Sequence, residues 1–77
     1  MHIYGYEDTG KPSGTVVPAL IAEITLNASP DELRAMAEFL QGCADEMDRM
    51  GESFEHVHLS DRQRQFATTP HFVVARG

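Results

Sequence analysis

Residues 29–51 read SPDELRAMAEFLQGCADEMDRMG, and this stretch decides the fold. Ser29 has the side chain of a typical helix N-cap, Pro30 suits the first helical position, and Glu32 is spaced to complete a capping box. Apolar residues then recur at intervals of three and four, which predicts one amphipathic helix from about residue 30 to about residue 50. Gly51 stands where a residue with positive φ would end the helix. The stripe that we expect to be buried consists of Leu33, Met36, Ala37, Leu40, Cys43, Ala44, Met47 and Met50.

Two small residues lie inside this helix. Gly42 should weaken it by about 1 kcal/mol relative to alanine, and we expect the glycine to allow close packing of the helix backbone. Cys43 falls on the apolar stripe, where a free cysteine is more often a small core residue than a nucleophile. As the one cysteine in the chain it cannot form an intramolecular disulfide, which fits a reducing cytosol.

On both sides of the helix the apolar period changes to two, which is typical of strands. The segments that alternate or are rich in β-branched residues are 2–6, 20–26, 54–59 and 71–75. We expect the first two strands to pair across a loop and the polar residues 62–65 to connect the last two. That first loop contains Gly10, Pro12, Gly14 and Pro18. In the second strand one face is wholly apolar, formed by Leu20, Ala22, Ile24 and Leu26.

The resulting order, ββαββ, predicts an α+β fold with a small four-stranded, mainly antiparallel sheet and one long helix packed on one face. At 77 residues the chain is expected to form a single domain, residues 1–77. One helix covers only one face of such a sheet, so the other face is solvated or covered by another protein.

The charge of the chain bears on its partners. The formal net charge is -6, and residues 30–52 alone contain seven acidic residues and two arginines. Phosphate binding depends on Lys and Arg, so we expect no nucleic-acid partner, whereas a basic protein surface would be attracted. A charged face that serves only solubility is the simpler alternative. The sequence shows no apolar run that could span a membrane and no secretory signal, which favours a cytoplasmic protein.

Residues 56–61, HVHLSD, place two histidines on one face of a predicted strand. Together with Asp61 or His71, the pair His56 and His58 has the donor types of a zinc site. The favoured interpretation is an outward-facing pair opposite an inward Val57 and Leu59, which can still contact a partner. We assign no metal or other cofactor.

An active site finds little support. The predicted sheet with one helix offers little volume for a concave pocket, and the chain has no glycine-rich phosphate loop. No catalytic residue is assigned, and the protein is not expected to be an enzyme. Tyr4 and Tyr6 would share one face of the first strand, where they either contact a partner or pack at the sheet edge.

Three stretches, MHIYGY, EITLNASPDELRAMAEFL and HVHLSD, together resemble the immunity protein 32 family of bacterial polymorphic toxin systems. The likeness runs from the first strand to about Asp61 and depends on the order and spacing of the three stretches. It implies a small cytoplasmic protein, encoded beside a secreted toxin, that binds this toxin and has no catalytic residues.

We therefore predict an immunity protein that neutralises a cognate toxin by binding and occlusion. Two alternatives stay open: a small metal-binding domain centred on the two histidines, and a structural module that forms a homodimer through its open sheet face. The predicted contact residues are Glu38, Asp45, Asp48 and Glu52 on the helix, with His56, His58 and Asp61 as a second patch.

Overall fold

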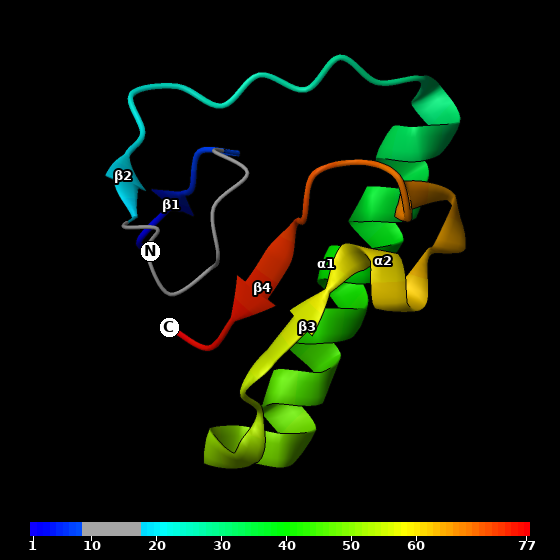
Figure 1. Cartoon of the computed structure of the whole chain (residues 1–77). Helices are drawn as coiled ribbons and strands as arrows, with labels where there is room; N and C mark the ends of the chain where they lie inside the picture. Colours follow the sequence, from blue (N-terminus) through cyan, green and yellow to red (C-terminus); the bar gives the residue numbers. More distant parts are fainter. Residues whose placement is uncertain (9–17) are drawn as a thin grey trace.

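A computed structural model describes residues 1–8 and 18–77. One long helix and a short one, two 3-10 turns and four short strands make up the described chain (Figure 1). In chain order the elements are β1 (Tyr4–Gly5), β2 (Ala19–Leu20), α1 (Pro30–Met50), η2 (Gly51–Ser53), β3 (His56–His58), α2 (Leu59–Arg62), η3 (Arg64–Phe66) and β4 (Val73–Ala75).

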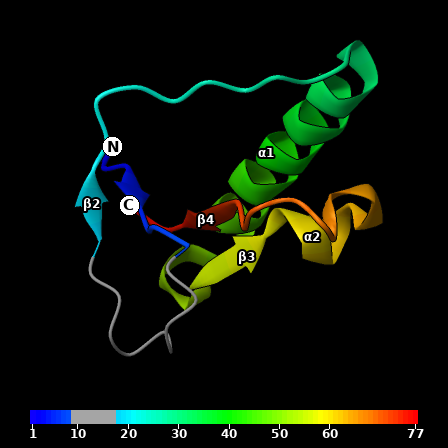
Figure 2. The same ribbon diagram turned by 45° about the horizontal axis from the view of Figure 1, so that its top comes forward.

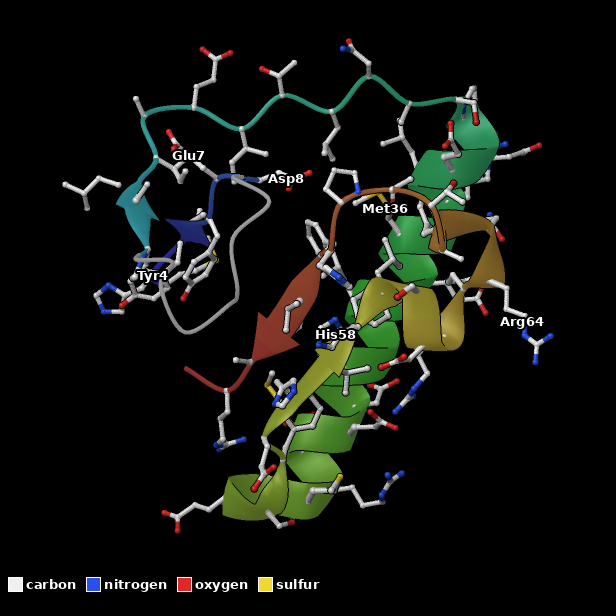
Figure 3. All side chains as sticks on the ribbon, in the orientation of Figure 1. Tyr4, Glu7, Asp8, Met36, His58 and Arg64 are labelled. Atoms are coloured by element: carbon white, nitrogen blue, oxygen red, sulfur yellow. The ribbon has the colours of Figure 1, made fainter. Side chains whose placement is uncertain are left out.

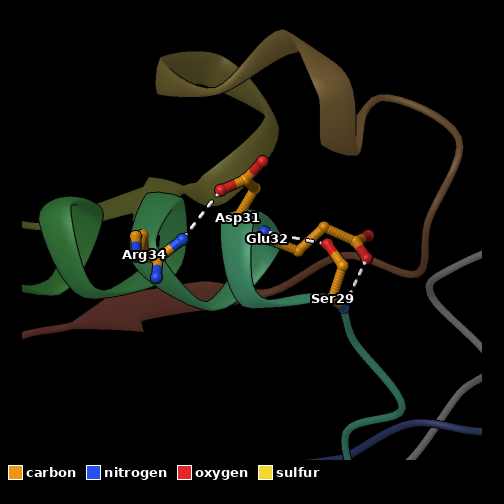
Figure 4. Close-up of polar contacts among 4 residues, drawn as sticks. All are labelled: Ser29, Asp31, Glu32 and Arg34. Carbon is orange, nitrogen blue, oxygen red and sulfur yellow. Dashed lines mark hydrogen bonds and ion pairs between the residues drawn. The ribbon is translucent and has the colours of Figure 1, made fainter.

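The helix α1 has the bounds and the caps that the sequence predicts. The Glu32 amide donates to the Ser29 side chain at 3.1 Å, and the Ser29 amide donates to the Glu32 carboxylate at 2.9 Å (Figure 4). These two bonds satisfy backbone donors that a helix start leaves without an intrahelical partner. At the other end Gly51 has a φ of 57°, a value that glycine adopts without steric cost.

The α+β class, the four strands and their order around the long helix are confirmed, but the strands form two separate sheets. β1 pairs with β2 and β3 pairs with β4, both antiparallel. The predicted strand 20–26 is paired only at Leu20, and the following residues up to α1 form an unpaired link. Gly10, Pro12 and Gly14 of the predicted loop lie outside the described residues, whereas the pairing of its two flanking strands is confirmed.

The region between β3 and β4 is more helical than expected. Leu59 was assigned to the end of a strand but begins α2, and the expected plain connection over 62–65 includes the start of η3. β3 is three residues long, and directly after it the chain turns back over α1. The Arg62 side chain reaches Glu46 of α1 in this position.

The hydrophobic core lies between α1 and the β3–α2–β4 segment. Phe39 was not on the predicted stripe, yet it is only 4% exposed, whereas Leu33 and Leu40 are 48% and 46% exposed. The predicted buried stripe is therefore wrong by part of a helical turn. The reason is that the two-stranded β3–β4 sheet covers only part of the apolar surface of α1. Of the predicted stripe, Ala37, Ala44 and Met50 are also exposed. The buried residues are Met36, Phe39, Cys43, Phe54, Leu59 and Phe66.

The β1–β2 hairpin contributes nothing to this core. Every residue of the core cluster, and every apolar residue packed against it, comes from position 35 or later. In both ribbon views the hairpin lies apart from α1, and the extended link crosses to the start of the helix (Figures 1 and 2). Among the described helices, none is long and apolar enough to cross a membrane.

Candidate partner-binding surfaces

An acidic surface runs along the solvent side of α1 and into η2. Glu38, Asp45, Asp48 and Glu52 are all exposed. The ion pairs found among residues 1–8 and 18–77 involve none of these four carboxylates. These four carboxylates therefore contribute negative potential on one side of the helix without a direct ion-pair partner among the described residues.

The arginines near this surface are paired with other acids. Arg34 lies 2.9 Å from Asp31 in the first turn of α1 (Figure 4). Arg62 of α2 forms a two-pronged hydrogen bond with Glu46 at 3.0 and 3.1 Å, and this bond raises the pKa of Arg62. Arg49 is 4.0 Å from the same carboxylate. Glu46 therefore joins α1 to α2, and its position marks the side of α1 that the chain itself covers.

The histidines of β3 point away from the core. His56 is opposite Ala75, and His58 is opposite Val73, in the antiparallel register, so these four side chains share the outer face of the hairpin. Val57 packs against the core on the other face, and Leu59 is buried beyond it. The outward-pair interpretation matches this arrangement.

The fold also brings His71 to His58. Their Nδ1 atoms are 3.3 Å apart and their rings are perpendicular, and the ring of His56 lies 5.6 Å from that of His58 (Figure 3 labels His58). At this distance the Nδ1–H of one ring can donate to the Nδ1 of the other, with the direction set by the tautomers, and the two nitrogens are also spaced to contact a single metal ion. Asp61 is exposed on α2 and forms no ion pair with a histidine in the described part of the chain.

No third ligand completes a metal site. Across residues 1–8 and 18–77, no group of three or more His, Cys, Asp or Glu side chains is arranged to hold an ion. The metal-binding alternative therefore rests on His58 and His71 alone, and Asp61 does not contribute to it.

Two hollows of the described surface are open to solvent. One, of about 250 Å³, lies between α1 and α2 and is lined by Glu38, Phe39, Gly42, Arg62 and Gln63. A groove of about 300 Å³ runs between the link and the 66–72 loop, with mainly apolar walls that include Leu26, Met36 and Phe72. Burial, assisted by the nearby Glu46 carboxylate, raises the pKa of the Cys43 thiol, so this cysteine is not an activated nucleophile.

Sequence reasoning missed one surface, the apolar residues that the small core leaves bare. Leu20 of β2 is 99% exposed, Ile24 of the link is 54% exposed, and Leu33 and Leu40 lie open on α1. The alternation over 20–26 and the width of the apolar stripe on α1 are the sequence signals for this surface. From the sequence, the α1 stripe is assigned to the core and 20–26 to a strand with one apolar face.

A family model matches the part of the chain that forms the core. The model of the family described as Immunity protein 32 matches residues 23–76, more than two thirds of the chain. No curated protein and no solved structure matches it. The match covers α1, the β3–β4 hairpin and every residue of the core. The chain belongs to the immunity protein 32 family.

Proposed function

We propose that this protein neutralises a cognate bacterial toxin by binding to it directly and occluding its active surface. The observation that carries the proposal is the family match over residues 23–76. The solvent-open hollows and the raised pKa of the Cys43 thiol fit an inhibitor that works by contact and not by chemistry. The proposed place of action is the cytoplasm of the toxin-producing cell.

The acidic surface of α1 is the proposed docking site for a cationic toxin face. Its carboxylates are exposed, are not paired with the nearby arginines, and project from a well-capped helix that holds them in fixed positions. Such a surface steers a basic partner into place and raises the association rate, most strongly at low salt.

The outer face of the β3–β4 hairpin is the proposed second contact. His56, His58 and His71 form a row of rings that offers flat, partly apolar area with polar edges. Side chains of this kind are common in protein interfaces, and they supply contact area that acidic side chains do not. Asp61 on α2 extends this patch at its edge.

The test combines alanine at Glu38, Asp45 and Asp48. We expect the association rate with the purified toxin to fall by about tenfold or more, and its salt dependence to flatten, because steering scales with these charges. Stopped-flow or surface plasmon resonance measurements at several salt concentrations provide the readout.

The matched control replaces Glu7 and Asp8, which removes two charges away from α1, and is compared with a variant that replaces only Asp45 and Asp48; Glu7 and Asp8 are labelled in Figure 3. Equal rates for the α1 variant and the unchanged protein would contradict the acidic docking site. A protein that neither binds the toxin nor protects cells expressing it would contradict the proposed function as a whole.

A further inference from the structure

The chain exposes far more surface than a folded monomer of its size. From the scaling of surface with mass, a folded protein of 8.6 kDa exposes about 4,700 Å², whereas this chain exposes 6586 Å². The excess is about 1,900 Å². Nine fully extended residues expose about 1,500 Å², and nine residues of a folded protein of this size expose about 550 Å², so the nine residues outside the described ranges account for at most about 950 Å² of the excess. Residues 1–8 and 18–77 therefore contribute at least about 950 Å² themselves. A standard protein interface covers about 800 Å² on each partner, so the surplus is large enough for one.

Part of this surface is a second apolar stripe on α1, formed by Leu33, Ala37, Leu40 and Ala44. At 3.6 residues per turn these four fall within an arc of about 60°. The stripe borders the buried face on the flank opposite Ala35 and Glu46, which are contacted from the α2 side. On its own flank Arg76, which follows β4, reaches the Met47 carbonyl at 3.5 Å. The stripe thus lies on the β4 side of the helix.

β4 has an open edge on that same side. The Leu59 amide donates to the Phe72 carbonyl, and the Arg76 amide donates to the Glu55 carbonyl. In an antiparallel ladder this alternation turns the backbone groups of Val73 and Ala75 away from β3. The β3–β4 sheet has two strands, so no strand from the described residues pairs with those groups. A third strand placed here would extend the sheet over the bare stripe of α1.

The link supplies a strand of the required kind. Residues 20–26 alternate with an apolar face, are extended, and have no ladder partner beyond Leu20 among the described residues. The chain leaves the helix at Ser29 and runs toward its β1–β2 hairpin, so its own 20–26 segment departs from β4 (Figure 1). In a strand-exchanged dimer, each protomer has an element that extends away from its own core on a short hinge and packs against the other protomer. The 20–26 segment has this arrangement.

We propose that the protein is a strand-exchanged homodimer, in which residues 20–26 of each copy pair with the β4 edge and cover the α1 stripe of the other. Glu23 is the sole charged residue of 18–28, so the segment brings one charge to the contact, on the face turned away from α1. Glu38 and Asp45 lie on another side of α1 and stay free, whereas Asp48 borders the stripe one turn after Ala44. A cationic toxin would occupy the acidic surface of α1 and leave the apolar stripe bare, which favours a second copy as the occupant here.

Solution mass gives the first test. We expect sedimentation velocity on the full chain to give the mass of a dimer at micromolar concentration. Ala37→Glu places a carboxylate in the stripe and should weaken the dimer by about 100-fold or more, because an unpaired charge would be buried. Ala67→Glu, a matched change at an exposed position beside η3, should leave the dimer intact. A monomer at high micromolar concentration, or equal behaviour of the two variants, would overturn the proposal.

Crosslinking tests the exchange without relying on any variant that weakens the dimer. One batch of protein carries Thr25→Cys, on the face of 20–26 opposite its apolar residues, and a second batch, distinguished by a longer tag, carries Val73→Cys on the outer face of the hairpin. The two batches are refolded together and treated with a short bismaleimide. A crosslinked heterodimer is expected, and replacement of Val73→Cys by Ala67→Cys should abolish it. The unchanged protein controls for the buried Cys43. If a chain with both cysteines links only to itself, the segment closes on its own β4 and the exchange is wrong. Neither experiment involves the toxin, so failure here leaves the proposed function untouched.

Discussion

At the scale of single residues, the start of α1 is the most completely determined site in the molecule. Ser29 and Glu32 each accept a hydrogen bond from the other's backbone amide, and Pro30 between them lacks an amide that would need a partner. The two hydrogen bonds, first from the backbone and then from the side chain of Ser29, lower the pKa of Glu32. The cap is therefore strongest when this carboxylate is charged.

Loss of this cap should have a measurable cost. Ser29→Ala is expected to lower the free energy of unfolding by about 1 kcal/mol, as measured by urea denaturation at neutral pH. Ser29→Asp, which also accepts from a backbone amide, should restore most of the loss. Equal stability of the alanine variant and the unchanged protein would show that the cap adds nothing to the folded state.

The same pair has a pH dependence of known sign. The folded-state pKa of Glu32 lies below its ordinary value of 4.5, so its contribution is fully present above that pH. It is lost as the pH falls through the lowered folded value. Glu32→Gln, which stays neutral, should remove this component, and the difference between the two proteins should shrink as the pH falls below 4.5.

At the scale of the elements, the glycine inside α1 and the glycine that caps its end have opposite roles. A Cβ built on Gly42 meets no atom within 4 Å, so the expected close packing at this position is wrong. Gly42→Ala should then raise the free energy of unfolding by about 1 kcal/mol through helix propensity alone. Gly51→Ala serves as the contrast, because the φ of 57° strains any residue with a side chain, and it should destabilise the protein. Thermal unfolding followed by circular dichroism separates the two, and a destabilised Gly42→Ala variant would reveal a contact at that glycine.

The helix was predictable because its signals are local. The cap, the three-and-four spacing and the terminal glycine all act within a few residues of one another. The buried face of the helix was not predictable, since Leu40 and Phe39 both suit a core. Only the position of the narrow β3–β4 hairpin decides which of the two is buried. The same holds for 20–26, whose alternation predicts a strand but does not name its partner.

The candidate surfaces were also predictable from the sequence only in part. Strand alternation correctly placed His56 and His58 outside and Val57 inside. The approach of His71 to His58 depends on the turn through α2 and η3, which the sequence did not reveal. Whether the seven predicted contact residues bind a toxin stays a prediction.

At the scale of the whole molecule, the small core sets the behaviour of the protein. Six residues of the described ranges 1–8 and 18–77 are buried, and none of the six is completely enclosed. A core of this size stabilises a single chain only marginally. If the exchanged dimer forms, its dissociation accompanies unfolding, so the melting temperature should rise with protein concentration. Scanning calorimetry over a hundredfold range of concentration measures this, and an unchanged melting temperature would indicate a monomer.

The single thiol of Cys43 gives the protein a built-in reporter. Since this sulfur is enclosed between α1 and the hairpin, a maleimide reagent reaches it only when those layers separate. The rate of alkylation therefore reports how fast the molecule opens. The reaction can be followed in a crude mixture by the increase in the mass of the protein. A bound toxin, or a second copy, would slow the alkylation without contacting the cysteine, because it would keep the two layers together.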